Sequence, residues 1–556
     1  MTSHCLTLLF DKAFIYFRFC PLKVHRFAMR NNEQQTLEKI SYRTGLDRIQ
    51  EAVISSHFMQ NFSCNENLDM YSEIAFHNKC ITVSAEFILE NIIPNLLRAA
   101  EDFSAARALL AKKRAGEKFD EYGVAKASEL GIAHFIAELM YDRNYSQNAG
   151  KYYSRNFLAD RVAERIAAGE AIHLTIPALP FKLPSPLKSR GPSPDLAEVN
   201  FLLQLFEITR SIDMLYREAQ PHIAHAGAKF TVISDGRRFN ALVGESDKAV
   251  QRYGEQIGWW IERLGISEYV EIADYRDLLG ARLSDELLRD KVRIREAAEA
   301  SYGGLMWPVF DPLQALKSLS MTSPIEPDPE KQNPGGRFSS LLQSLVFTIK
   351  YPCLKRVTEA LPGLDGSRYL ALYRELTGHL FVRYPDANPC AFDEVLRQVR
   401  AGGGEGLSPD AMECLRQTML REVWQATIRY MAEIKSDREL AQEPISTCLP
   451  DSFRWTIHAK RGQIAIMTPT ALGLSVQAWA GTAVFKRSKK GGVKLCTLPV
   501  VALEGVGSIP VTVRDERNLF GLDDQPLFYI YPDVGVSNLG GLIEDLASSL
   551  VRTRAM

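Results

Sequence analysis

An alternation of strand-like and helix-like segments between residues 172 and 272 constrains the fold more than any other feature of the chain. Short apolar runs with the length of buried strands alternate there with longer segments whose apolar side chains recur at helical spacing. The predicted elements are strands at 172–176, 229–234 and 269–272 and helices at 195–217 and 247–264. Connections of this kind are typically right-handed crossovers on a parallel sheet. The sequence therefore predicts an α/β core built on a parallel sheet.

The rest of the chain divides where its composition changes. Residues 323–336 contain four prolines and residues 401–409 contain four glycines, which is typical of linkers. Further elements are predicted as a helix from 411 to about 434 and strands at 455–457, 464–466 and 483–485. We predict an extension at 1–35, a helical N-terminal region at 36–170, the α/β core at 171–319, a helical insertion with linkers at 320–410 and a smaller α+β C-terminal part at 411–556.

Charge and cysteine usage exclude several classes of protein. The 66 lysines and arginines balance 67 acidic residues, so the overall charge predicts neither a nucleic-acid partner nor a membrane surface. The apolar start is interrupted by Asp11, Lys12 and Arg18, which argues against a signal peptide or a membrane span. The nine cysteines are scattered without a C-x-x-C pair, which favours a reduced, cytoplasmic protein.

Common cofactor and metal motifs are missing from the sequence. G-x-G-x-x-G after a strand, the phosphate-binding G-x-x-x-x-G-K-[ST] loop and H-E-x-x-H do not occur, which excludes dinucleotide, nucleoside triphosphate and zinc-protease hypotheses. His222 and His225 lie three residues apart but have no third ligand at a suitable spacing, so a helix-end position is favoured over a metal site. Trp259 and Trp260 fall in a helical run and are interpreted as packing residues.

Two loops should lie at the ligand-binding edge of the sheet. In an open parallel sheet, ligands bind beyond the carboxyl ends of the strands. The loop after Ile176 holds five prolines and presents Lys182, Lys188 and Arg190, cations that can bind an anionic ligand. The alternative for this loop is a rigid surface crossover with solvated charges.

The second loop follows Ile233 and reads Ser234-Asp-Gly-Arg-Arg-Phe239. A carboxylate and a guanidinium flank a glycine where the strand ends, so both charges can converge on one ligand. The alternative is a turn closed by an ion pair between Asp235 and Arg237.

The segments around these loops resemble the pyoverdine/dityrosine biosynthesis family. The resemblance is carried by Pro177-x-x-Pro-Phe-Lys182, by Pro194-Asp-Leu-Ala-Glu198 and above all by Val232-Ile-Ser-Asp-Gly-Arg-x-Phe239 followed by Val243-Gly-x-Ser-Asp247. Trp455-Thr-Ile-His458-Ala-Lys460 is similar to a further family segment. The resemblance covers residues 170–310 well and residues 411–490 loosely.

The resemblance implies a Rossmann-like core and an isocyanide synthase of secondary metabolism. Such an enzyme joins an amino acid, expected to be aromatic, to ribulose 5-phosphate, whose C2 becomes the isonitrile carbon. Cations would then hold the phosphate, and acid/base groups would move protons during condensation and elimination. The expected catalytic residues are Asp235, Arg237 and His458, and the expected substrate-binding residues are Lys182, Lys188, Arg190, Ser234 and Phe239. This chemistry requires no cofactor and no metal, and a downstream oxygenase acting on the product is the expected partner.

Two departures from the family pattern leave alternatives open. Ala241 stands where an acidic residue is expected, and Trp479-Ala480 replaces an expected tryptophan–histidine pair. The rival hypotheses are a tyrosine N-formyltransferase, which needs a one-carbon donor, and a non-catalytic member of the family.

Overall fold

The computed structural model describes residues 80–118, 129–146, 154–183, 189–240, 245–280, 285–303, 357, 360–361, 387–388, 390–402, 407–439, 449, 451–457, 463–466, 476–487, 492–504, 506–515, 520–522 and 525–534. The chain divides into two compact units. The larger unit comprises Glu73–Ala241, Glu245–Leu283 and Pro444–Met556, and the smaller unit comprises Met1–Ser72, Leu242–Gly244 and Ser284–Glu443. Each unit is described by itself.

A five-stranded parallel sheet forms the centre of the larger unit. Its strands are β2 (Ile172–Pro177), β3 (Ala228–Ser234), β4 (Val270–Asp274), β5 (Phe453–Thr456) and β6 (Ile464–Ala465). They lie in the order β4-β3-β2-β5-β6, and every pairing is parallel. The strand order reverses beside β2, which creates a topological switch point. The predicted α/β core and its three strands are confirmed, and two further strands come from the C-terminal part.

The crossover helices begin at capping residues that the sequence already shows. In α12 (Leu196–Ala219), the Asp195 carboxylate accepts a hydrogen bond from the Ala197 backbone N–H at 2.7 Å, and Glu198 completes a capping box. In α14 (Asp247–Arg263), the Ser246 hydroxyl accepts from the Ala249 N–H at 3.1 Å. Such caps satisfy N–H groups that a helix leaves without partners. Both predicted helices are confirmed, and the short helices α13 (Gly236–Phe239) and α15 (Tyr275–Gly280) directly follow β3 and β4.

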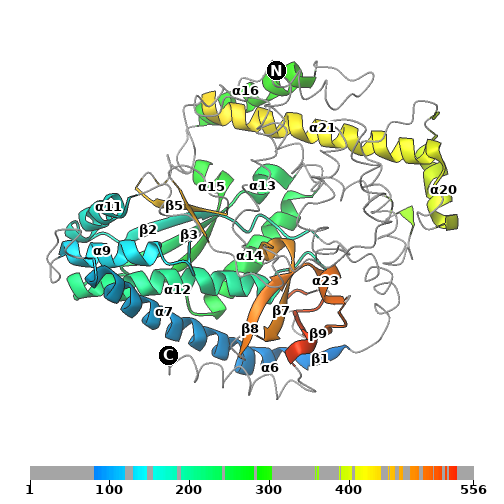
Figure 1. Ribbon diagram of the computed structural model, residues 1–556. Coiled ribbons are helices and arrows are strands. Elements are labelled where there is room, and N and C mark those ends of the chain that lie inside the picture. Colours follow the sequence, from blue (N-terminus) through cyan, green and yellow to red (C-terminus); the bar gives the residue numbers. More distant parts are fainter. Residues whose placement is uncertain are drawn as a thin grey trace, which may run out of the picture. The chain divides into compact units, whose positions relative to one another are not determined.

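An N-terminal group of helices packs against α12. It consists of α7 (Ile93–Gly116), α9 (Glu129–Met140) and α11 (Arg155–Ala167), and α7 runs beneath α12 in Figure 1. The short segments α6 (Ala85–Phe87) and η1 (Ile88–Ile92) lead into α7. The predicted helical character is confirmed for these residues but is wrong for β1 (Ile81–Ser84), which is a strand. Its partner β9 lies more than 400 residues later, beyond the reach of local periodicity.

A second, mixed sheet is formed by the C-terminal part together with β1. Its remaining strands are β7 (Thr482–Arg487), β8 (Val493–Leu498), β9 (Ile509–Arg514) and β10 (Phe528–Ile530), in the order β1-β9-β10-β7-β8. β1 and β10 pair in parallel with β9 and β7, whereas β9–β10 and β7–β8 are antiparallel. The short helical turns in this part are η3 (Ala478–Ala480), α23 (Val500–Glu504) and η4 (Pro532–Val534).

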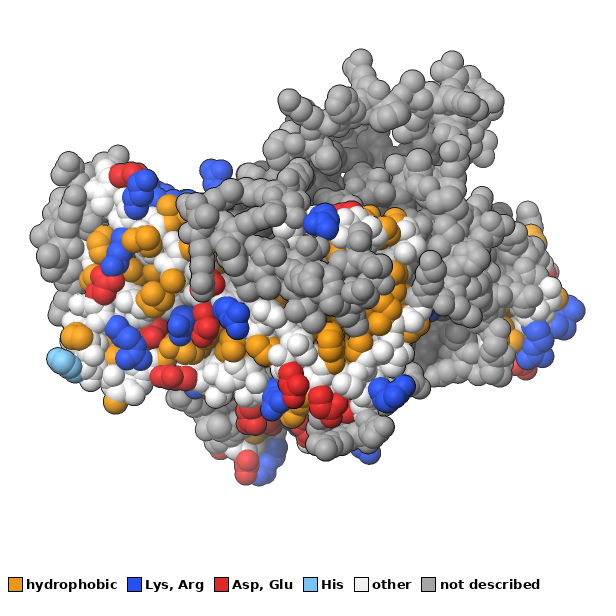
Figure 2. Space-filling model, turned by 90° about the horizontal axis from the view of Figure 1, so that it is seen from below, with side chains coloured by type: hydrophobic (Ala, Val, Ile, Leu, Met, Phe, Trp, Pro, Cys, Tyr) orange, Lys and Arg blue, Asp and Glu red, His pale blue; other side chains and the backbone are white. Residues whose placement is uncertain are grey.

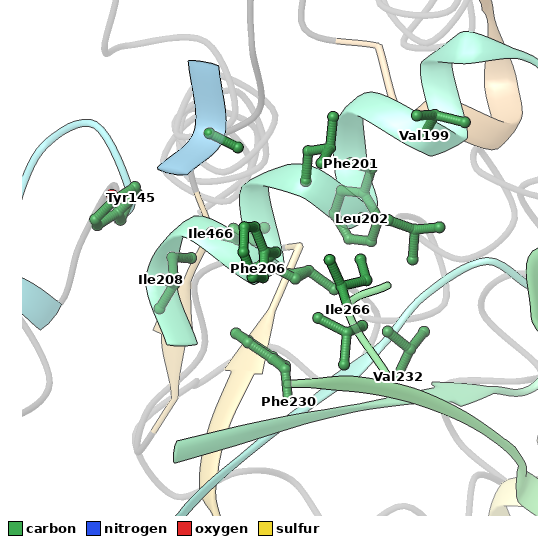
Figure 3. Packing of buried hydrophobic residues seen from close by; sticks show 14 of the residues in the cluster. Tyr145, Val199, Phe201, Leu202, Phe206, Ile208, Phe230, Val232, Ile266 and Ile466 are labelled. Atoms are coloured by element: carbon green, nitrogen blue, oxygen red, sulfur yellow. The ribbon is translucent and has the colours of Figure 1, made fainter. Parts of the chain in front are cut away.

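Apolar side chains fill the space between the parallel sheet and α12. Figure 3 shows Phe206 of α12 directed toward the strand that carries Phe230. The Phe230 ring meets Trp455 of β5 edge-on at 5.8 Å, which joins the C-terminal strand to the core. Trp260 is 1% exposed and packs with Trp259, so the interpretation of this pair as packing residues is confirmed.

The described part of the smaller unit is helical. It comprises α16 (Asp285–Gly303), α20 (Phe392–Gly402) and α21 (Pro409–Glu439). A 2.7 Å ion pair between Lys291 and Glu433 links α16 to α21. The long helix predicted from residue 411 is confirmed and extends further at both ends. Most of the predicted insertion at 320–410 lies outside the described residues.

The described surface mixes both signs of charge. Figure 2 shows lysine and arginine side chains interspersed with aspartate and glutamate on the face it presents. None of the helices in the described ranges combines the length and the apolar character needed to cross a membrane.

Candidate functional site

The two loops singled out in the sequence meet at the carboxyl edge of the parallel sheet. Pro177, at the end of β2, is paired in register with Ile233 near the end of β3. The Ala178 N–H donates to the Ile233 carbonyl at 3.2 Å, and the buried Ser234 hydroxyl donates to the Leu179 carbonyl at 3.1 Å. The prediction that both loops share one sheet edge is confirmed.

The contact between these loops is unusually close. Leu179 is fully buried and has φ +53°, a conformation that bulky L-residues rarely adopt. A Cβ placed on Gly236 would lie 2.0 Å from the Pro180 carbonyl oxygen. Only glycine therefore lets the backbone of the first loop rest on the turn after β3. Backbone strain of this kind persists where the surroundings over-determine it, which is common at functional sites.

Lys182 follows this contact in the chain and belongs to a buried network of charges. Its ammonium is 2.9 Å from the carboxylates of both Asp195 and Glu198, and all three side chains are buried. The Tyr253 hydroxyl donates to Glu198 at 3.1 Å, and the Thr482 hydroxyl donates to Asp195 at 2.7 Å. The structure thus gives Lys182 two carboxylate partners inside the protein, and a phosphate could reach its ammonium only by displacing them.

Burial and like charge act on the carboxyl group of Glu198. Burial raises its pKa to about 7, with the neighbouring Asp195 acting in the same direction and Lys182 opposing both. The same burial raises the pKa of the Tyr253 hydroxyl, which stays protonated as the donor to Glu198. The network therefore consists of two carboxyl groups that share one cation at the N-terminus of α12.

The second loop directs its charges toward β4. Asp235 directly follows β3 and has φ −99° and ψ 16°, in the sparsely populated bridge region where many active-site residues occur. The Arg237 guanidinium is 3.1 Å from Asp277 and 3.6 Å from Asp274. Asp277 is 71% exposed, whereas Asp274 is 16% exposed. A carboxylate and a guanidinium thus converge at the ends of β3 and β4, with Asp235 at the start of the same turn.

Asp274 is a site residue that the sequence interpretation missed. It ends β4 and is paired in register with Ser234. Burial raises the pKa of its carboxyl group, while the Arg276 N–H and the Arg237 guanidinium act in the opposite direction. The rule that identified Ser234 and Asp235, a polar residue at the carboxyl end of a parallel strand, would also have identified Asp274.

The remaining predicted site residues divide between described and undescribed positions. Phe239 and Tyr275 flank the Arg238 guanidinium, which lies 4.6 and 4.5 Å from their ring centroids. Arg190 is exposed and follows the buried Ser189. Lys188, Ala241 and His458 lie outside the described residues, although β5 ends two residues before His458 at the same sheet edge.

The other residues noted in the sequence lie beside α12 or in the segment that follows it. Trp479 meets Phe201 edge-on at 6.0 Å, and Ala480 ends the same 3₁₀ turn. His222 and His225 are exposed in the segment after α12. Within the described residues, no group of three or more histidine, cysteine, aspartate or glutamate side chains is placed to hold a metal ion.

The segment that contains this edge matches a known family. Residues 162–321 match the family described as pyoverdine/dityrosine biosynthesis protein. Over these residues, the chain is similar to that family. It is 33% identical over 157 residues to the L-tyrosine isonitrile synthase of Pseudomonas aeruginosa, a match that covers 26% of this chain and 45% of that protein. It is 36% identical over 97 residues to an L-tryptophan isonitrile synthase of Fischerella ambigua, a match that covers 17% of this chain and 28% of that protein.

These matches span less than half the length of either relative. Among solved structures, the chain is similar to the PvcA protein from Pseudomonas aeruginosa with 18% identity and a TM-score of 0.35, over 67% of this chain and 90% of that one. The family match and the similar synthases confirm the resemblance seen in the sequence for the segment that carries the two loops.

Proposed function

We propose that this protein is an isocyanide synthase. It would convert the amino group of an aromatic amino acid, tyrosine or tryptophan, into an isonitrile, with C2 of ribulose 5-phosphate as the carbon donor. The observation that carries the proposal is that the family match at 162–321 contains the carboxyl ends of β2, β3 and β4, with Ser234 and Asp274 paired in register. The relatives named above support the substrate class, since they are isonitrile synthases for L-tyrosine and L-tryptophan.

The phosphate of the pentulose needs cations within reach of solvent. We assign this role to Lys188, Arg190 and Arg237. The Arg237 ion pair with Asp277 is exposed on the aspartate side, and such pairs contribute only about 0–1 kcal/mol. A phosphate dianion can replace Asp277 and accept two parallel hydrogen bonds from the guanidinium, which makes Arg237 the stronger candidate for orientation.

Proton transfers are assigned to carboxyl groups and to an imidazole. The amine of the substrate must lose a proton before it attacks the ketone at C2, and the condensation then releases water. Asp235 is the proposed base for this step. Asp274, whose pKa is raised by burial, retains a proton more readily and can donate it to a departing oxygen. His458 is proposed to serve the later eliminations.

Incubation of the purified full-length protein with C2-labelled ribulose 5-phosphate and a panel of amino acids tests the proposal. Mass spectrometry should detect one labelled carbon in an isonitrile product, without added metal or nicotinamide. Asp274→Asn is the matched inactive control, since it keeps the shape of the side chain but cannot exchange a proton. An N-formyl product formed only with a one-carbon donor would identify the formyltransferase, and no product with any donor would identify a non-catalytic protein.

The product also defines a place in metabolism. An isonitrile is a reactive group that a later enzyme has to process, so an oxygenase acting on it is the proposed partner in secondary metabolism.

A further inference from the structure

Lys182, which belongs to the strained loop at residues 177–183, is enclosed by the protein. The Lys182 side chain is 0% exposed, as is that of Glu198, and Asp195 is 2% exposed. One ammonium and two carboxylates leave the network with a net charge of about −1 when both acids are ionised. Buried charges are tolerated where partners satisfy them, and the hydroxyls of Tyr253 and Thr482 supply two further donors here.

Lys182 also connects the strained loop to a helix. It follows Leu179 by three residues, and its two partners are the N-cap residue and the third residue of α12. Between these positions, the Pro180 carbonyl rests on the face of Gly236. The loop is therefore held at one end by the Ser234 hydroxyl bond to Leu179 and at the other by the ion pairs of Lys182.

We propose that Lys182 is a positioning residue rather than a phosphate ligand. Its ammonium, held by Asp195 and Glu198, fixes residues 177–183 against the turn after β3, and this contact sets where Arg237 lies. The effect on catalysis rests on the proposed isocyanide synthase activity, whereas the effect on the loop does not.

Charge balance distinguishes this role from direct binding. Lys182→Met leaves two buried carboxylates facing each other without a cation, which should release the loop. Adding Glu198→Gln restores the original net charge. Glutamine at the third position of a capping box can accept from the Asp195 N–H as glutamate does, and its amide can donate to the Asp195 carboxylate. A residue that binds phosphate directly cannot be replaced in this way.

The experiment compares Lys182→Met, the double variant Lys182→Met/Glu198→Gln and the control Lys229→Met. Lys229 forms a more exposed ion pair with Glu271 and lies at the opposite end of β3, so its loss should leave the loop unchanged. The measurements are hydrogen exchange of the backbone amides at 178–183 and steady-state kinetics with ribulose 5-phosphate varied.

For Lys182→Met we expect faster exchange at 178–183 and a fall in kcat of about tenfold or more, with KM for ribulose 5-phosphate changed less than about threefold. The double variant should recover most of the protection and of kcat. If Lys182→Met does not fold, the double variant by itself tests whether Lys182 positions the loop or binds the phosphate. A folded double variant with a roughly tenfold higher KM would overturn the proposal, because it would show that the ammonium itself binds the phosphate.

Exchange unchanged from wild type in Lys182→Met would also overturn it. If the wild-type protein forms no isonitrile, the proposed function fails, and the exchange measurement still tests the loop.

Discussion

Gly236→Ala tests the contact on which the geometry of the site depends. The added Cβ would lie 2.0 Å from the Pro180 carbonyl oxygen and 2.6 Å from a methyl carbon of Val250. Ordinary contacts between such atoms are longer by roughly 1 Å or more, so the loop backbone has to move by about that distance. Overpacking of this kind costs about 1–3 kcal/mol, and the better helix propensity of alanine offsets up to about 1 kcal/mol. We therefore expect a net loss of about 1–2 kcal/mol in the free energy of unfolding.

The same displacement should reduce turnover. A shift of about 1 Å in a catalytic group can lower the rate by roughly a hundredfold, and Arg237 is the next residue in the chain. Urea unfolding measures the loss of stability, and isonitrile formation measures the loss of activity. Both losses are expected in the same variant, because one movement of the loop causes them.

Gly254→Ala is the matched control. Gly254 lies within α14, and a Cβ added there meets no atom within 4 Å. Alanine in a helix interior should raise the free energy of unfolding by about 0.5–1 kcal/mol and leave turnover unchanged. If Gly236→Ala proves as stable and as active as Gly254→Ala, the close approach of the two loops is refuted.

Three further predictions follow from burial, charge and hydrogen bonding. Trp260→Ala should lower the free energy of unfolding, measured in urea, by about 3–5 kcal/mol. Leu109→Ala should change it by no more than about 0.5 kcal/mol, because the Leu109 side chain is 69% exposed. Burial raises the pKa of Glu207 from 4.5 to about 8, so the folded protein holds a proton that the unfolded chain releases. Wild-type stability should therefore fall relative to Glu207→Gln as pH rises from about 4.5 to 8, and equal slopes in the two proteins would contradict the assignment. The free energy of unfolding of Arg237→Lys should lie within about 1 kcal/mol of wild type, because the partner Asp277 is exposed. The variant should nevertheless lose most of its turnover, since one ammonium cannot form a bidentate pair. Normal turnover would show that Arg237 is not part of the site.

Local sequence patterns were sufficient to predict the crossover elements of the core. The helices α12 and α14 were predicted because their apolar side chains recur at helical spacing. In the structure, Asp195 and Ser246 cap their starts through bonds to N–H groups two or three residues away. The strands β2, β3 and β4 were predicted because they are short, largely apolar runs with the length of buried strands. That both loops lie at one edge followed from the parallel direction of these strands.

The site could be predicted only in outline. Ser234, Asp235 and Arg237 were predicted as site residues because they lie at the end of a strand or directly after it. The same rule was not applied to the next strand, β4, so Asp274 was missed. Lys182 was predicted as a substrate-binding cation because a lysine among prolines carries no sign of its partners inside the protein. Asp195 and Glu198 lie 13 and 16 residues further along the chain.

The sequence by itself therefore determined the α/β class, the order of the crossover elements and the family resemblance of residues 162–321, because periodicity and motifs depend on neighbouring residues. The tertiary structure decided which distant segments share a sheet: it placed β5 beside β2, β6 beside β5 and β1 beside β9. It also decided which charges are neutralised inside the protein. Burial and ion pairing depend on atoms that meet only after folding, so the same lysine can be a solvated cation in the sequence and the centre of a buried network in the structure.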